Sequence, residues 1–145
     1  MPVELKSLAS LPDALSLQPP RGYRPMAWLG LLVNVSLLPL TLAFILNDPY
    51  WRTVNISVGA GGVLPAAVLG IIASIALLRW LHWGQIVAIV ALSLSLAVVL
   101  PYAIVRLVLL EPGRIVWAVS APLACALNVA ALLFWCRPSI RAYLR

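Results

Sequence analysis

The residues best suited to chemistry in this chain are few and stand far apart. Cys125 and Cys136 are the two cysteines and are eleven positions apart. On a helix that spacing is about 16 Å, whereas the Cα atoms of a disulfide lie about 4.4–6.8 Å apart. The two thiols match neither a redox pair nor a zinc-binding motif, and we interpret both as buried apolar residues. The cysteines therefore predict no redox or metal chemistry.

The histidine and the carboxylates likewise predict no metal or cofactor site. His82 stands between Trp80 and Trp83, a setting that favours a side chain at the membrane surface over a haem ligand. The acidic residues are isolated, whereas a calcium or magnesium centre needs several oxygen ligands together. They are Glu4, Asp13, Asp48 and Glu111. We predict no catalytic residue, no metal site and no cofactor, and we expect that the protein is not an enzyme.

Composition places the chain in a membrane. Of its 145 residues, 63% are apolar and 10% are charged, against roughly 25% charged in a typical soluble domain. This excludes a soluble enzyme and a disulfide-stapled secreted module. The net charge of +6 is spread over tails and loops, without the dense basic patch of a nucleic-acid-binding protein. We expect the bilayer, and no nucleic acid, as a partner, with the basic residues facing anionic headgroups.

Four apolar segments are each close to the ~20 residues that a membrane-spanning helix needs. Short loops join them, which predicts an all-α bundle of four antiparallel transmembrane helices between two tails. Tryptophans stand near the segment ends, as in an interfacial belt. The predicted spans are 26–46, 58–78, 86–105 and 115–135, with an N-terminal tail at 1–25 and a basic C-terminal tail at 136–145.

The distribution of basic residues predicts the orientation. Seven Lys and Arg residues fall in the two tails and the second loop, and three fall in the first and third loops. Because basic residues concentrate on the cytoplasmic side, both termini are expected in the cytoplasm. Arg106 stands at a span end, where a long side chain can reach the membrane surface. Asp48 and Glu111 share the outer face with Arg52 and Arg114, which favours salt-bridged loop caps.

Polar residues within the spans predict one layer inside the bundle. Asn34, Ser93 and Asn128 fall at matching depths of about 10–12 Å from the cytoplasmic face, counted at about 1.5 Å per residue. An amide without a partner is costly in hydrocarbon. We therefore expect these side chains to hydrogen-bond one another across the bundle. Bonding to their own helix backbone is the alternative, and it suits serine better than asparagine.

Two stripes of small residues predict helix contacts, because small side chains let helix backbones approach closely in lipid. Ala66, Gly70 and Ser74 form one on the second span. Ser120 and Ala124 form the other on the fourth span, continuing to Asn128. Each stripe is expected to face either a neighbouring helix of the bundle or a partner protein.

Prolines and glycines predict irregular helices in the outer half of the bundle, the half away from the cytoplasm. Each span holds one proline, which can kink a helix by removing a backbone hydrogen bond. The kinks could open a functional cavity or only disturb packing, and the second reading is favoured. Gly59, Gly61 and Gly62 predict a loose start to the second span. The prolines are Pro39, Pro65, Pro101 and Pro122.

The C-terminal segment Arg137-Pro138-Ser139-Ile140-Arg141-Ala142-Tyr143 resembles the tail of small bacterial four-helix membrane proteins that end in a Pro-x-aliphatic-Arg-x-aromatic pattern. The resemblance implies a bacterial, cytoplasm-facing terminus, and it implies no activity. On physical grounds, the tail is expected to anchor at the membrane surface through its arginines and its tyrosine. These anchoring residues are Arg137, Arg141, Tyr143 and Arg145.

Together these observations favour a non-catalytic accessory or scaffold subunit of a larger membrane assembly in a bacterial inner membrane. Its partners would be other membrane subunits or further copies of the chain. The alternative is a small oligomeric transporter or channel for a neutral or small solute, using the proline-rich outer half and the Asn34–Asn128 layer.

Overall fold

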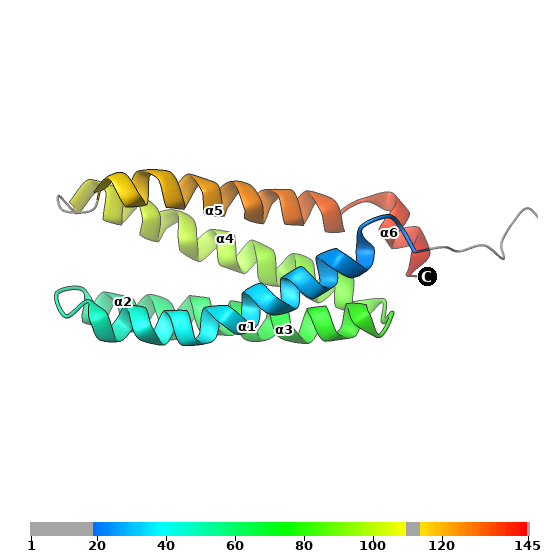
Figure 1. Ribbon diagram of the computed structural model, residues 1–145, viewed down its shortest axis with the longest axis horizontal. Coiled ribbons are helices and arrows are strands. Elements are labelled where there is room, and N and C mark those ends of the chain that lie inside the picture. Colours follow the sequence, from blue (N-terminus) through cyan, green and yellow to red (C-terminus); the bar gives the residue numbers. More distant parts are fainter. Residues whose placement is uncertain (1–18, 110–113, 145) are drawn as a thin grey trace, which may run out of the picture.

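The protein is helical throughout the part that the computed structural model describes, residues 19–109 and 114–144. Figure 1 shows long helices lying side by side, with one short helix at the C-terminal end. In chain order the helices are α1 (Tyr23–Asn47), α2 (Arg52–Val58), the π-helix η1 (Gly59–Val63), α3 (Leu64–Leu78), α4 (Trp83–Leu109), α5 (Arg114–Trp135) and α6 (Pro138–Tyr143).

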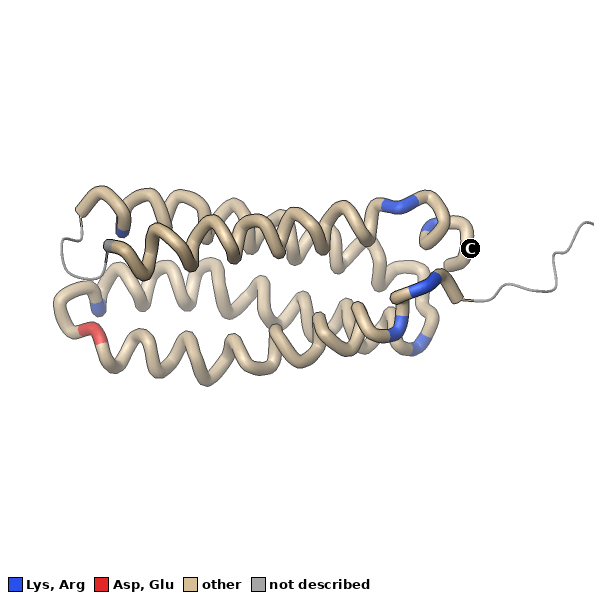
Figure 2. The backbone as a smooth tube through the Cα atoms, turned by 45° about the horizontal axis from the view of Figure 1, so that its top comes forward, with Lys and Arg blue, Asp and Glu red and all other residues tan. Residues whose placement is uncertain are grey.

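Four stretches are long and apolar enough to cross a membrane, which confirms the predicted number of spans. They are Tyr23–Asn47, Arg52–Leu78, Trp83–Leu109 and Ile115–Trp135. In Figure 2 the charged residues of the described chain lie near the two ends of the bundle, with none along its middle. The apolar middle is the part that a bilayer would cover.

The second span begins earlier than its hydropathy indicates. Helix α2 starts at Arg52, and α2, η1 and α3 run on as one helix of 27 residues. The glycines at 59, 61 and 62 therefore lie inside the span, and the predicted loose start at this point is wrong. Pro65 explains the π-helix, because proline lacks an N–H and its ring crowds the carbonyl four residues earlier. A π-turn widens the backbone there.

Helix α3 occupies the middle of the packing order. It contacts α1 on one side and α4 on the other, and α4 in turn contacts α5. Helices α1 and α5 approach each other near their ends through aromatic rings. Phe44 meets Trp117 at one end, with ring centroids 5.9 Å apart, and Tyr23 meets Trp135 at the other, at 5.7 Å.

These ring contacts mark the two ends of the molecule. We call the end that holds Tyr23 and α6 the Tyr23 end, and the opposite end, which holds the α1–α2 turn, the Arg106 end. Both the start of α1 and helix α6 lie at the Tyr23 end (Figure 1), where the rings of Tyr23 and Tyr143 are 5.8 Å apart.

A cluster of buried hydrophobic residues lies at the Tyr23 end. The hydroxyl of Tyr23 donates a hydrogen bond of 2.8 Å to the Leu77 carbonyl at the end of α3. Its ring stacks on Trp80 at 5.0 Å. The buried side chains around it are Ala27, Ala73, Leu77, Ala88, Trp135, Ile140 and Leu144. Because Ile140 and Leu144 are buried there, the predicted C-terminal tail is in part a helix that closes this end.

Trp80 completes this end with an unusual backbone. Its φ of 61° lies in the left-handed region, which glycine usually occupies at the end of a helix. The Leu81 amide donates to the Ala76 carbonyl and the Trp80 amide donates to the Leu77 carbonyl, both at 2.9 Å, which is the hydrogen-bond pattern of a Schellman motif. The ring of Trp80 also lies beneath the Arg24 guanidinium, whose Cζ is 5.3 Å from the ring centroid. These contacts hold a tryptophan where glycine is usual.

Candidate functional site

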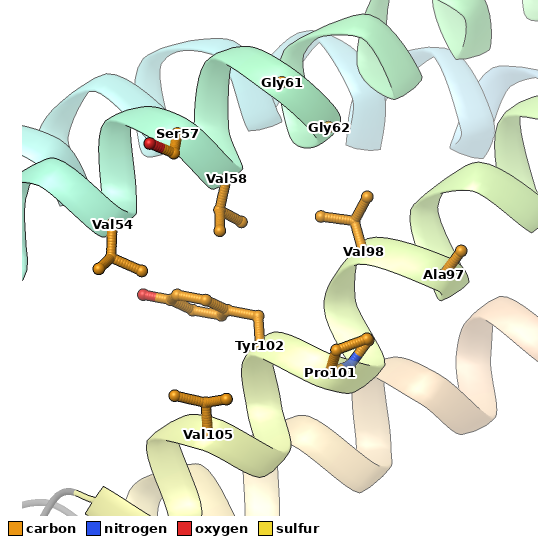
Figure 3. A pocket seen from close by; sticks show the side chains of 10 residues that line it. All are labelled: Val54, Ser57, Val58, Gly61, Gly62, Ala97, Val98, Pro101, Tyr102 and Val105. Carbon is orange, nitrogen blue, oxygen red and sulfur yellow. The ribbon is translucent and has the colours of Figure 1, made fainter.

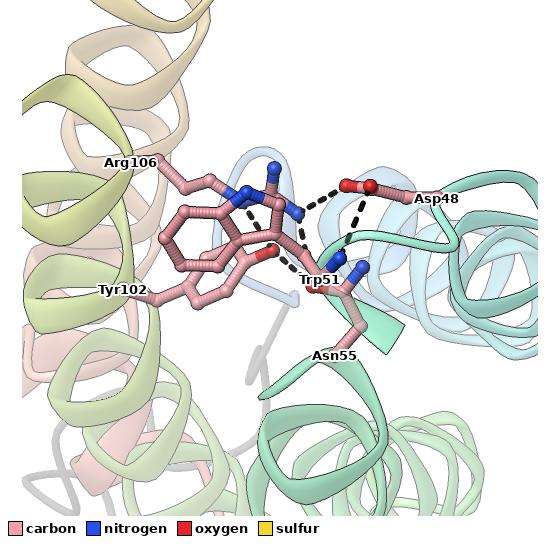
Figure 4. Close-up of polar contacts among 5 residues, drawn as sticks. All are labelled: Asp48, Trp51, Asn55, Tyr102 and Arg106. Atoms are coloured by element: carbon pink, nitrogen blue, oxygen red, sulfur yellow. Dashed lines mark hydrogen bonds and ion pairs between the residues drawn. The ribbon is translucent and has the colours of Figure 1, made fainter. Parts of the chain in front are cut away.

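The Arg106 end holds the most concentrated polar chemistry of the described chain. Asp48 lies in the turn after α1, and Asn55 lies one helical turn into α2. Tyr102 and Arg106 stand one turn apart on α4, so they share one helix face. Three separate segments thus bring these four side chains to one place (Figure 4).

Arg106 is the centre of this hydrogen-bond network. Its Nη2 donates to Asp48 Oδ2 at 2.6 Å and to Asn55 Oδ1 at 2.9 Å. Its Nε donates to the Tyr102 hydroxyl at 2.8 Å, and that hydroxyl donates to Asn55 Oδ1 at 2.6 Å. Asn55 accepts twice through one oxygen, while its buried Nδ2 makes no hydrogen bond.

Aromatic rings surround the same guanidinium. The Cζ atom of Arg106 is 4.6 Å from the ring centroid of Trp51, 5.3 Å from those of Phe44 and Tyr102, and 5.6 Å from that of Trp117. A cation within about 6 Å of a ring face is attracted by the negative potential of that face. Because these rings come from α1, the α1–α2 turn, α4 and α5, one cation joins four parts of the chain.

The electrostatics of the pair follow from its burial. The side chain of Arg106 is 2% exposed and that of Asp48 is 25% exposed. The hydrogen bond from Arg106 holds the pKa of Asp48 below its usual value of 3.8, so the carboxylate is charged at neutral pH. A buried cation that loses its partner is strongly destabilising, by about 3–5 kcal/mol for a fully buried pair. We therefore assign Asp48 as the group that makes the burial of Arg106 tolerable.

This network corrects two expectations about charges. The side chain of Arg106 is buried and does not extend away from the bundle, because Asp48 and four rings offer it a set of partners there. Asp48 pairs with Arg106 and not with Arg52, which is exposed at the start of α2. The second predicted loop cap involves Glu111, which lies outside the described residues.

An open groove of about 470 Å³ lies beside the Arg106 network, between α2–η1 and α4 (Figure 3). Its walls are almost entirely apolar, and the Tyr102 ring reaches into it between the valines of both helices. Irregular packing was predicted around the prolines of all four spans, and one of these prolines, Pro101, lines the groove. The other lining residues are Val54, Ser57, Val58, Gly61, Gly62, Ala97, Val98, Tyr102 and Val105.

The residues of the predicted polar layer do not join into one network. Asn34 donates to the Gly30 carbonyl of its own helix at 2.7 Å. Asn128 donates to Ser95 Oγ on α4 at 3.0 Å, and its Oδ1 is buried without a hydrogen bond. Ser93 is exposed, since it is two residues, or about 200° of helix, from Ser95. The structure thus differs from the expectation: matching depth did not bring these side chains face to face.

The small-residue stripe of the second span lies within the bundle. Ala66, Gly70 and Ser74 are buried. A Cβ added at Gly70 would collide with the Asn34 side chain, and one at Gly30 would be 3.0 Å from Ser74 Oγ. This stripe is therefore the place where α1 and α3 approach closely.

The stripe of the fourth span points elsewhere. Ser120 and Ala124 are exposed, while the neighbouring Ala121 is buried. Asn128, which continues this stripe, bonds to Ser95 on α4 and so meets a neighbouring helix. For the exposed Ser120 and Ala124, contact with a partner stays a prediction.

The C-terminal residues have two kinds of surroundings. The ring of Tyr143 packs against Trp80 at 5.3 Å and against Tyr23, so it is half-buried within the Tyr23 end. Arg141 is exposed, and Arg137 lies over the Phe134 ring at 5.2 Å. Arg145 lies outside the described residues. Membrane anchoring by these residues stays a prediction.

Sequence reasoning missed two polar contacts between helices besides the Arg106 network. The Tyr23 hydroxyl bonds to the Leu77 carbonyl, and Gln85 Nε2 donates to the Trp135 carbonyl at 2.5 Å. Gln85 stands just outside the predicted third span, and Tyr23 stands among arginines and prolines that resemble a tail. A hydropathy reading has no signal for such residues, because it ends where the apolar run ends.

Arg106, Tyr23, Gln85 and Asn128 each make a hydrogen bond that joins two segments of the described chain, whereas Asn34 bonds within its own helix and two buried amide atoms, Asn55 Nδ2 and Asn128 Oδ1, make no hydrogen bond. Comparison with known proteins adds no assignment: no family model, no curated protein and no solved structure matches this chain.

Proposed function

We propose that this protein is a non-catalytic accessory or scaffold subunit of a larger membrane assembly, with α5 as its docking helix. The observation that carries the proposal is the exposed small-residue face of α5. Ser120 and Ala124 are exposed although Ala121, on the adjacent face, packs in the bundle. In lipid, small residues favour association because they let a second helix come close.

The interior of the bundle supports this proposal. Arg106, Tyr102 and Asn55 hydrogen-bond to one another, and Gln85 and Tyr23 bond to helix-end carbonyls. Such contacts rigidify a bundle, and a rigid bundle suits a subunit that presents a fixed surface to its neighbours.

The proposed setting has four antiparallel spans, with both termini in the cytoplasm of a bacterium and the Arg106 end outside. The excess of basic residues in the tails and second loop supports this orientation. Under it, the Tyr23 end with α6 faces the cytoplasm, and the groove beside Tyr102 lies in the outer leaflet.

The test compares two alanines of α5 after mild detergent extraction from native membranes. Ala124 and Ala126 are both exposed, and they stand about 200° apart around the helix. We expect Ala124→Leu to reduce recovery of a stoichiometric partner strongly, because a large residue in a packed contact costs about 1–3 kcal/mol. Ala126→Leu should keep the partner at the wild-type level. Equal recovery in both variants would reject α5 as the docking helix.

The same extraction experiment distinguishes the accessory subunit from the alternative function, a small transporter or channel. A homo-oligomer that moves a solute across liposome membranes, with no other subunit present, would favour the transporter or channel and reject the accessory role.

A further inference from the structure

We infer that the groove between α2–η1 and α4 is a binding site for one acyl chain of a membrane lipid. The inference does not rest on the accessory role proposed above. It rests on the place of the groove, on a glycine without a packing reason and on the chemistry of the walls.

The groove lies along two membrane-spanning stretches and begins near the Arg106 end. Its walls extend from Val54 to Gly62 on one side and from Ala97 to Val105 on the other. Each wall covers nine residues, and eight rises of about 1.5 Å give a length of about 12 Å. One leaflet contributes about 15 Å, half of the roughly 30 Å hydrocarbon core. The groove thus runs parallel to the chains of one leaflet for most of their depth.

The second observation that supports a lipid site is the open space beside Gly61. A Cβ added at Gly61 would meet nothing within 4 Å, whereas one at Gly62 would be 2.5 Å from Val98 Cγ2. Gly62 is therefore needed for the close approach of α4, and Gly61 is not. Glycine within a helix destabilises it by about 1 kcal/mol relative to alanine. No described residue occupies the space beside the Gly61 Cα, and Gly61 lines the groove.

The walls select an apolar occupant. Ser57 and Tyr102 carry the two side-chain hydroxyls that line the groove. Ser57 donates to the Thr53 carbonyl at 3.0 Å, and Tyr102 bonds to Asn55 and Arg106. Since both hydroxyls are engaged, the remaining surface is that of valines, glycines, an alanine and a proline. The volume of about 470 Å³ is within the roughly 300–1,000 Å³ of small-molecule sites, and hydrocarbon is the ligand class that needs no hydrogen bond.

The test places the full-length protein in vesicles of palmitoyl-oleoyl phosphatidylcholine that contain a small share of phosphatidylcholine with a diazirine in one acyl chain. After illumination, mass spectrometry locates the label. Gly61→Leu adds a side chain at a groove position where an added Cβ meets nothing within 4 Å. Ala60→Leu is the matched control, because Ala60 is exposed and does not line the groove. The exposed residues Leu123 and Leu127 of α5 report ordinary lipid contact.

We expect wild-type labelling at the groove residues to exceed labelling at the α5 reference. Gly61→Leu should lower groove labelling roughly tenfold, because its side chain displaces several methylene groups of the lipid. Ala60→Leu should leave it unchanged, and thermal unfolding in detergent should show that both variants fold.

Three results would overturn the inference. One is wild-type groove labelling no higher than at α5, which means ordinary lipid contact only. Another is equal groove labelling in wild type and Gly61→Leu. The third is crosslinking of the groove residues to a second copy or another protein, which would make the groove a protein interface.

Discussion

The two ends of the molecule solve the same problem with different chemistry. At both ends four helical segments must be held together where the spans meet water. The Arg106 end uses a buried cation, one carboxylate and four rings. The Tyr23 end uses a neutral hydroxyl, stacked rings and the apolar face of α6.

The difference has a physical consequence. The ion pair is sensitive to the removal of either charge, because a buried charge without its partner is costly. The Tyr23 end has no buried charge among its described residues, so each lost contact there removes only its own modest contribution. We expect a single substitution that removes a charge to cause a large loss of stability at the Arg106 end. At the Tyr23 end we expect each substitution to cause only a small loss of stability.

The largest effect is expected from Asp48→Asn, which leaves Arg106 buried without a counter-ion. Because a quarter of the Asp48 side chain is exposed, we expect a loss near the lower limit for buried pairs, about 3 kcal/mol. Thermal unfolding of the purified protein in detergent measures it. Arg52→Gln is the control, since Arg52 is an exposed arginine of the same end, and it should unfold like wild type. If both variants unfold alike, the ion pair does not stabilise this end.

Gly70→Leu tests the contact that lies between the two ends. The new side chain would run into Asn34, and overpacking typically costs about 1–3 kcal/mol. Hydrogen exchange should rise along both α1 and α3, towards both ends alike. Gly61→Leu is the matched control with open space around it, and it should not raise exchange. Unchanged exchange in Gly70→Leu would mean that α1 and α3 are not in close contact there.

Tyr23→Phe should have a smaller effect at its own end. It removes one buried hydrogen bond to the Leu77 carbonyl while keeping the stacked ring, and such a bond is worth about 1 kcal/mol. The measurement is the unfolding temperature, with Tyr50→Phe as the control because Tyr50 is 96% exposed. A loss as large as that of Asp48→Asn would contradict the contrast between the two ends.

The smallest effect is expected from mild acid. The pKa of Asp48 is lowered from 3.8 by its hydrogen bond with Arg106, so the stability from its charge is fully present above about pH 4. It is lost as the pH falls through the lower pKa of the folded protein. Hydrogen exchange at the Arg106 end should therefore be constant from pH 7 to about pH 4, after correction for intrinsic rates, and should rise below it. A rise that starts above pH 5 would show that another group is responsible.

Most of the fold could be predicted because it depends on local hydropathy. The four spans follow from apolar runs of sufficient length, and the stripe around Gly70 follows from helical periodicity. The start of the second span at Arg52 was missed, since polar residues can continue a helix past its apolar run. The polar layer was inferred from depth along the helices, and depth does not tell which way Ser93 points.

The site could not be predicted because it depends on pairing across the chain. Asp48 and Arg106 are 58 positions apart, and nothing in their spacing selects them over Asp48 and Arg52. An arginine at the end of an apolar run usually reaches the surface. Only the folded positions of Trp51 and Trp117 show that aromatic rings offer Arg106 an alternative inside.

The most direct test of the contrast between the ends is a double-mutant cycle on Asp48 and Arg106. Unfolding free energies are measured in one detergent for wild type, Asp48→Asn, Arg106→Met and the double variant. We predict that the double variant is more stable than Asp48→Asn alone, because methionine removes the buried charge that lost its partner. The coupling energy should then be at least about 1 kcal/mol. Additive effects of the two substitutions, with the double variant the least stable of the four, would contradict an Arg106 end that is held together by its ion pair.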